Sequence, residues 1–436
     1  MKKLVTLLIV CVSFLYATDI ESWKNDFIKA HGNFGQTDDH GRTFYYGEAT
    51  INVTPLDPAY VKELVLAYEK AMLNLQSDFI LQTFGRETVQ RLAEIVENDS
   101  TNADQFPPLP EAQKMAQQGK IATIFNKALD VIDKKLDKEL EELGVPPQQL
   151  QKMTVEQKKT LFKDKLSSKI VKEAFSSMEG LVPYQVKIGT ITTPVGKATK
   201  VAIIAITSPK TIQFAKDIAR QRPTQVRGKP HTLSDLLPKA KEDYLNEIGL
   251  RYSYDEQGRP MLISYGMWSV TQKVTSPSRY LKKIDLAKRK ARMRAESYIG
   301  DFIKTNIQAI ESQDASSLEE EVAKKITTVD AAGNSSQKIR DNIKETLDSY
   351  FKKFKSSSNF SLQGTSEAYN WDYKEPKTGM IYVGSVVTWN YNQLNNVKRY
   401  IHQKHNTAKT TKTQAKTKSS VTIERESKVI NDVEDF

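Results

Sequence analysis

Two stretches of this chain follow the same order of strand, turn and helix, and this duplication constrains the fold more than any other feature. Residues 43–80 read TFYYGEATINVTPLDPAYVKELVLAYEKAMLNLQSDFI, and residues 262–303 read LISYGMWSVTQKVTSPSRYLKKIDLAKRKARMRAESYIGDFI. In each stretch a partly alternating apolar pattern predicts a strand, a proline opens a helix, and apolar or small residues recur at helical spacing. We therefore expect one supersecondary unit that is used twice.

Single residues also match between the two copies. At a constant offset of 217, the matches pair Lys24, Asp26, Gly32, Asp38, Gly41 and Arg42 with Lys241, Asp243, Gly249, Asp255, Gly258 and Arg259. If the second copy contains two additional residues after this point, Gly47 matches Gly266 and Pro58 matches Pro277. One further additional residue matches Ala67 with Ala287 and Ala71 with Ala291. Chance supplies a few identities but not readily the same order of elements, so duplication is favoured over coincidence.

Each copy closes with a predicted hairpin, over residues 183–207 and 360–390. A mostly helical, polar insertion separates the first long helix from the first hairpin, over about 85–180. We predict an α+β fold of two tandem repeats, 18–225 and 226–402. Each repeat is an antiparallel sheet with helices packed on one face, and the helical insertion belongs to the first.

The two ends of the chain predict an exported protein with a tail. Residues 1–17 combine two lysines, an apolar core and a terminal alanine, as a signal peptide does, and are too short for the ~20 apolar residues of a membrane span. Lipid attachment at Cys11 is not expected, because Val10 before it is large, and cleavage after Ala17 leaves no cysteine. We expect a periplasmic or secreted protein without a membrane span, whose residues 403–436 form a disordered basic-then-acidic tail.

Recognised catalytic, metal and nucleotide motifs are absent from the sequence. The five histidines lack zinc spacing, the glycines form no phosphate-binding loop, and no nucleophile motif occurs. Acidic runs at 137–142 and 318–321 are best read as solvated helix faces. We therefore expect no catalytic residue, no metal and no cofactor, and a protein that is not an enzyme. An envelope hydrolase would need polar groups converging in a pocket, which sequence spacing does not reveal.

The helix predicted over 282–294 is strongly basic and carries Ala287, Ala291 and Ala295 as a small-residue stripe. Its basic residues are Lys282, Lys283, Lys288, Arg289, Lys290, Arg292 and Arg294. This face suits an anionic ligand such as an acidic glycan, and the net charge of +11 favours anionic partners in general. The alternative is a helix that covers a sheet and holds its long basic side chains in solvent. Nucleic acid is not expected outside the cytoplasm.

Aromatic residues gather on the predicted strands of the second repeat, and they either line a binding groove or pack within the sheet. They are Trp268, Tyr369, Trp371, Tyr382, Trp389 and Tyr391. The candidate binding site combines basic and aromatic side chains. It consists of Lys288, Arg289, Arg292, Arg294, Trp268 and Trp389.

A glycine-bearing strand, an alanine-striped helix and a late hairpin occur together in both copies. The residues are Tyr46 and Gly47 with Ala67 and Ala71, and Tyr265 and Gly266 with Ala287, Ala291 and Ala295. The pattern resembles the LPP20, SIMPL and flagellar FlgT N-terminal group of bacterial envelope proteins. The resemblance implies an exported protein of the Gram-negative envelope, although the insertion and the doubling depart from single-domain members.

These expectations favour a non-enzymatic envelope scaffold that binds a protein partner through its two repeats. The alternative function is a glycan- or anion-binding module that uses the 282–294 helix and the aromatic residues of the second repeat.

Overall fold

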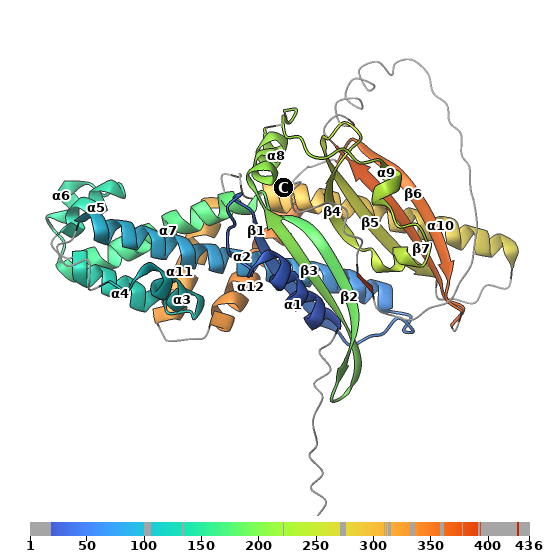
Figure 1. Ribbon diagram of the computed structural model, residues 1–436, viewed down its shortest axis with the longest axis horizontal. Coiled ribbons are helices and arrows are strands. Elements are labelled where there is room, and N and C mark those ends of the chain that lie inside the picture. The colour runs from blue at the N-terminus through green and yellow to red at the C-terminus, as the bar shows by residue number, and fades with distance from the viewer. Residues whose placement is uncertain are drawn as a thin grey trace, which may run out of the picture.

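The computed structural model describes residues 19–99, 106–132, 135–220, 222–270, 276–308, 310, 312, 315–331, 336–357, 362–376, 378–390, 393 and 425–426. The predicted signal peptide with Cys11 lies outside these residues, as does the predicted tail apart from Arg425 and Glu426. The described chain forms a helical lobe at one end and two antiparallel sheets at the other (Figure 1). None of the described helices is both long and apolar enough to cross a membrane.

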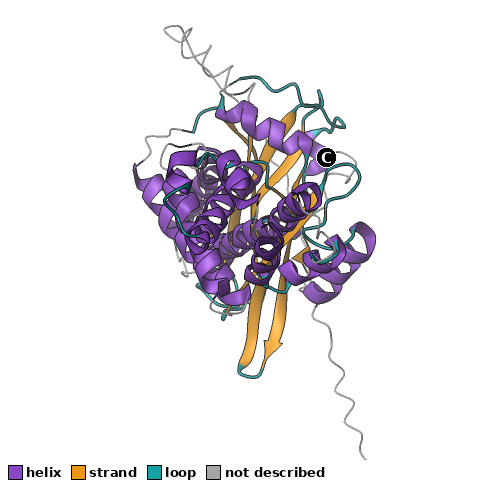
Figure 2. Cartoon of the chain, turned by 90° about the vertical axis from the view of Figure 1, so that its left-hand side faces the viewer, coloured by secondary structure: helices purple, strands orange, loops and turns teal. Residues whose placement is uncertain are grey.

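The first sheet has the strand order β1-β3-β2-β8. Its strands are β1 (Thr43–Ile51), β2 (Val182–Thr193), β3 (Gly196–Thr207) and β8 (Arg425–Glu426). β1 runs antiparallel to β3, with Thr43 opposite Thr207 and Ile51 opposite Thr199. The β2–β3 hairpin extends beyond the body of the molecule (Figure 2).

The second sheet has the order β4-β5-β7-β6. Its strands are β4 (Gly249–Tyr254), β5 (Pro260–Val270), β6 (Thr365–Lys374) and β7 (Ile381–Trp389). Apart from the edge strands β4 and β8, the order β5-β7-β6 of the second sheet repeats β1-β3-β2 of the first. The predicted α+β fold with two antiparallel sheets is therefore confirmed, and the copies share a topology as well as residues.

The turn that precedes β1 recurs in front of β5 with the same hydrogen bonds. Asp38 accepts hydrogen bonds from the backbone N–H and the Nε of Arg42, at 2.9 and 2.7 Å. Asp255 accepts the same two bonds from Arg259, at 3.0 and 2.8 Å. Gly41 and Gly258 occupy matching places with φ of +74° and +67°, which glycine adopts without strain.

Each copy also packs a long helix closely against its central glycine. A Cβ at Gly47 would collide with the backbone oxygen of Ala71 in α2 (Tyr60–Asp99). A Cβ at Gly266 would collide with the backbone oxygen of Ala291 in α10 (Pro277–Phe302). The glycine therefore lets strand and helix approach more closely than any side chain would permit.

The helical lobe is built from both repeats. The first contributes the far half of α2 with α3 (Leu109–Gln117), α4 (Ile121–Ile132), α5 (Leu136–Glu142), α6 (Pro147–Leu150) and α7 (Val155–Met178). The second contributes α11 (Ala315–Ala331) and α12 (Ser336–Ser357), which pack on α7 and α2. The insertion predicted for the first repeat is thus one part of a lobe that the second completes.

The remaining helices cover the sheets or connect them. They are α1 (Asp19–His31), α8 (Pro209–Ala219), α9 (Leu233–Leu236), a 3₁₀ turn (Asp243–Asn246) and a π-helical stretch (Ile303–Gln308). α1 covers the face of the first sheet opposite α2, where Phe27 lies 5.0 Å from the Phe44 ring.

α2 joins the two repeats. The Tyr68 hydroxyl accepts a hydrogen bond from the Leu250 N–H at 3.0 Å, and its ring lies 5.0 Å from that of Tyr298 in α10. Gln76 donates to Asn306 at 3.0 Å, and both side chains are buried. One hydrophobic core consequently runs from the lobe along α2 into both sheets.

Candidate functional site

The predicted basic helix exists as α10, and its alanine stripe faces the second sheet. Ala287, Ala291 and Ala295 are buried, and the Ser264 hydroxyl of β5 donates a 2.7 Å hydrogen bond to the Ala295 carbonyl. Small side chains allow this close packing. The basic residues consequently lie on the flanks of the helix and on its outer side.

Arg292 and Arg294 serve as links between elements. Arg292 donates through Nε to Glu296 at 3.0 Å, and its Nη1 lies 3.7 Å from a carboxylate oxygen of Glu367 in β6. The Arg294 Nη1 lies 3.6 Å from a carboxylate oxygen of Glu69 in α2. These ion pairs partly neutralise both guanidinium groups, which were predicted to bind an external anion.

Three other predicted residues lie at the surface or near it. Arg289 is exposed and Lys288 is half-buried. Trp268 is half-buried, and the ammonium group of Lys290 lies 4.5 Å above its ring. This cation–π pair occupies the ring face that a sugar would stack upon.

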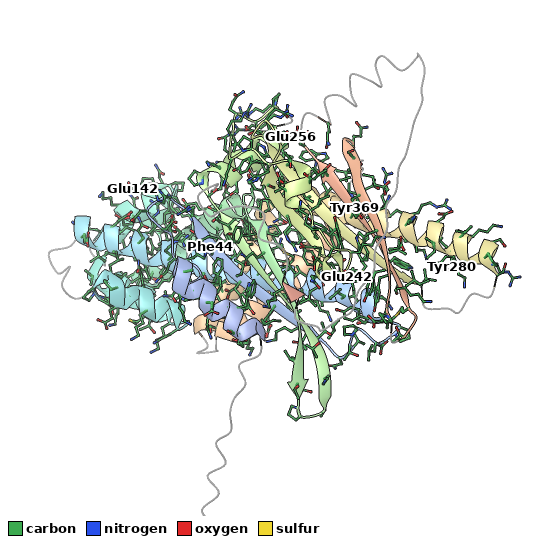
Figure 3. The ribbon with its side chains drawn as sticks, turned by 45° about the vertical axis from the view of Figure 1, so that its right-hand side comes forward. Phe44, Glu142, Glu242, Glu256, Tyr280 and Tyr369 are labelled. Carbon is green, nitrogen blue, oxygen red and sulfur yellow. The ribbon has the colours of Figure 1, made fainter. Side chains whose placement is uncertain are left out.

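Trp389 does not line a groove. It is 2 % exposed, and its indole N–H donates a 2.8 Å hydrogen bond to the Gln363 carbonyl. Trp371 and Tyr382 are buried too, so of the two alternatives packing within the sheet holds for these three residues, and the assignment of Trp389 to a binding site is wrong. Tyr369 lies at the surface of β6 (Figure 3), stacked 5.2 Å from Tyr244. Tyr391 lies outside the described residues.

The outer side of α10 combines apolar and basic side chains. Leu286 and Met293, two turns apart on one side of the helix, are 49 % and 66 % exposed. Arg279 and Lys282, both exposed, lie on the same helix as the exposed Arg289. The first turns of α10 extend past the sheets, with Tyr280 near the free end (Figure 3). We call these side chains (Arg279, Lys282, Leu286, Arg289 and Met293) the outer face of α10.

A cavity of about 850 Å³ lies elsewhere, between α2, α3, α12 and the 33–37 loop. The sequence analysis missed it. Its walls are both apolar and polar. Among the residues that line it are Phe34, Leu81, Asp78, Gln82, Arg86 and Arg340. A second, shallower hollow between α6 and α7 is open to solvent and lacks such a convergence of paired charges.

Asp78 is at the centre of the polar wall. One carboxylate oxygen accepts from Nε and Nη2 of Arg340, each at 2.7 Å, and the other accepts from the amide of Gln82. Burial raises the pKa of Asp78, and the neighbouring Arg340 charge only partly opposes this rise. The ion pair also ties α2 of the first repeat to α12 of the second.

A sequence signal for this wall exists in α2. Asp78, Gln82 and Arg86 follow one another at four-residue spacing, and such polar residues share one helix face. Arg340 gives no such signal, because it lies 262 residues from Asp78.

Metal chemistry has no candidate among the described residues, where no three His, Cys, Asp or Glu side chains gather as ligands. His402 and His405 lie outside the part of the chain that the structure describes.

Comparison with known proteins gives information on the fold alone. Residues 121–220 match a family model described as "Domain of unknown function (DUF6844)". No curated protein matches this chain. A crystal structure at 2.3 Å of hypothetical protein FTT1539c from Francisella tularensis is similar, with a TM-score of 0.51 and 21% identity over 85% of this chain and 89% of that chain. The α+β arrangement therefore occurs in a second protein over nearly its whole length.

Proposed function

We propose that this chain is an exported, non-enzymatic envelope protein that holds an acidic protein partner against the outer face of α10. The observation that carries the proposal is the exposure of Leu286 and Met293 among basic side chains on a helix anchored by buried alanines. Apolar anchors surrounded by charge are typical of protein interfaces, and the positive charge selects an acidic partner.

Two further features support a scaffold. The shared core and the ion pairs of α10 with α2 and β6 hold the outer face on a rigid body, which reduces the ordering cost of binding. Residues 1–17 support export, and the resemblance to the LPP20, SIMPL and FlgT N-terminal group supports an envelope location.

The test is site-specific photocrosslinking in the native host, with the photoreactive residue at Leu286 or Met293. We expect an adduct with an envelope protein at these positions and none with the residue at Lys169, on α7. The purified partner should then bind the full mature chain, and Leu286→Ser combined with Met293→Ser should weaken binding at least tenfold. Absence of adducts at 286 and 293, or unchanged binding by the double variant, would contradict the proposal.

Binding of an anion or acidic glycan is the second candidate function, and its remaining support is the exposed pair Lys282 and Arg289. Lys282→Glu with Arg289→Glu should abolish binding to cell-wall glycan in that case. Arg292 is unsuitable for this test, because charge reversal there would break its links to Glu296 and Glu367.

A further inference from the structure

A short strand from the far end of the chain lies on the edge of the first sheet. β8 pairs antiparallel with β2, with Arg425 opposite Ile188 and Glu426 opposite Lys187. Opposite charges at facing positions favour such a pairing. β8 also lies beside the 3₁₀ turn Asp243–Asn246, which belongs to the second repeat. The outer edge of β2 therefore accepts an extended segment of the chain at the boundary between the two repeats.

The direction of β8 points along the junction between the two sheets. Because β8 is antiparallel to β2, its continuation beyond Glu426 leads towards Val182, where β2 begins. β2 and β4 are neighbours at this junction (Figure 1). Val182 and Tyr184 of β2 share an apolar cluster with Tyr252 and Tyr254 of β4. An extended segment that continues from β8 would consequently run between the edges of β2 and β4.

The length of β4 matches a short extended segment. β4 has 6 residues, begins shortly after the 3₁₀ turn beside β8, and ends at Tyr254. At about 3.3 Å per residue, residues 427–432 would span roughly 20 Å, which is the length of a strand such as β4. Residue 432 would therefore reach the end of β4 at Tyr254.

The sequence of this segment suits a strand that is buried on both faces. Residues 427–430 read SKVI, and in a strand Val429 and Ile430 would point to opposite faces. The junction is apolar on both sides, since Ile188 belongs to one hydrophobic cluster and Val182 to the other. Each of the two apolar side chains would thus find apolar surroundings.

An exposed basic loop lies at the far end of β4. Residues 220–231 read RQRPTQVRGKPH and contain no acidic residue. The Gly228 N–H donates to the Gly258 carbonyl at 3.0 Å, which holds the loop beside the turn that follows β4. The charged side chains here are the exposed Arg220, Arg227, Lys229 and Glu256 and the ion pairs Arg222–Asp217 and Arg259–Asp255. Residues 432–435 read DVED, so a segment that follows β4 brings its acidic end to a region of positive charge.

We propose that residues 427–436 dock as a strand between β2 and β4 and that their acidic end binds the basic loop 220–231. β8 begins this strand, Val429 and Ile430 anchor it, and the strand joins the two sheets. This segment belongs to the stretch that the sequence predicts as a disordered tail. The docking surface is separate from the outer face of α10, so the proposal goes beyond the proposed function.

Hydrogen–deuterium exchange on the full mature chain tests the docking. Backbone amides that pair in a sheet exchange slowly, whereas amides open to solvent exchange at their intrinsic rates. Relative to intrinsic rates, we expect residues 427–432 to exchange about tenfold or more slowly compared with residues 408–418, the basic part of the tail. Equal exchange in the two stretches would overturn the proposal.

Photocrosslinking identifies what the segment contacts. With the photoreactive residue at Val429, we expect adducts to residues 182–188 or 249–254 of the same chain. The matched control has the photoreactive residue at Lys412 and should give no adduct to these strands. Mixing two isotopically distinct copies separates adducts within a chain from adducts between chains. Adducts between copies would assign the β2 edge to a second copy, and adducts scattered as for the control would remove the site; either result contradicts the proposal.

Charge exchange tests the acidic end. Glu434→Lys with Asp435→Lys should remove the slow exchange of the segment, and so should Arg220→Glu with Lys229→Glu. Combining all four changes should restore it, because both sides are then reversed. Lys127→Glu, at an exposed position on α4, is the matched control and should leave the exchange unchanged. If the charge variants keep the melting temperature and the exchange pattern of the unaltered chain, the basic loop is not the binding site.

Discussion

Asp38 and Asp255 show the duplication at the scale of single residues. Each carboxylate closes a turn by accepting from the backbone and the guanidinium of the arginine four residues later. An aspartate, a glycine and an arginine at this spacing identify both turns in the sequence. The hydrogen bonds themselves are a finding of the structure, and they explain why these residue types recur.

Asp38→Asn tests the turn at two pH values. Hydrogen bonds to Arg42 lower the pKa of Asp38 despite the opposing effect of burial. The charged carboxylate therefore stabilises the folded state at pH values above about 4, the ordinary pKa of an aspartate. That contribution is lost as the pH falls through the lowered folded-state pKa. We expect Asp38→Asn to lower the free energy of unfolding, measured by urea denaturation, by about 1–2 kcal/mol at pH 7. The difference in this free energy from the unaltered chain should shrink towards pH 3. An equal difference at both pH values would contradict this origin.

Residue types alone did not distinguish anchored basic groups from exposed ones. Arg289 and Arg292 are three positions apart in the sequence, yet Arg292 pairs with Glu296 and Glu367 while Arg289 is exposed. Glu367 comes from a distant strand, and helical periodicity alone does not predict which flank of α10 it approaches.

At the scale of elements, the contact between a central glycine and an alanine-bearing helix defines each repeat. β1 packs on α2 and β5 packs on α10 at a separation that leaves no room for a Cβ. The pattern of strand, proline-led helix and alanine stripe predicted both pairs of elements. It predicted helices on one face only, which is wrong for the first sheet, because α1 covers the face opposite α2.

Gly47→Ala and Gly266→Ala should each destabilise the protein by about 1–3 kcal/mol or more, because the added methyl meets a helix backbone oxygen that has little freedom to move. Gly300→Ala is the matched control, since its Cβ would meet only the Leu362 side chain, at an ordinary contact distance of 4.0 Å. That substitution should be neutral or stabilise by about 0.4–1 kcal/mol. Urea denaturation followed by circular dichroism measures all three. If Gly300→Ala lost as much stability as the other two variants, close packing of the glycine against a helix would not be the cause of the destabilisation.

At the scale of the whole molecule, the two repeats complete one another. α11 and α12 of the second repeat pack on α7 and α2 of the first, and the Asp78–Arg340 ion pair lies at that junction. The cavity and the lobe both require residues from both halves of the chain.

Full-length protein should therefore unfold in one cooperative transition, because the two repeats share a core. Trp23 reports on the first repeat, and Trp268, Trp371 and Trp389 report on the second. Fluorescence of the Trp23→Phe variant and circular dichroism should give coincident urea transitions. Residues 18–225 expressed alone should lack a cooperative transition, since α2 and α7 would expose their apolar faces. Separate transitions, or a stably folded 18–225 fragment, would contradict a shared core.

Local pattern determined much of this protein: the duplicated units, the strand and helix of each, the late hairpins and the α+β class. These depend on periodicity and on turn residues within a few positions of one another, which a sequence records directly. Only the tertiary structure decided which basic side chains are paired, that Trp389 is buried, and that Asp78, Gln82 and Arg86 meet Arg340 around a cavity. Those outcomes depend on how residues hundreds of positions apart pack together, and no local spacing specifies that packing.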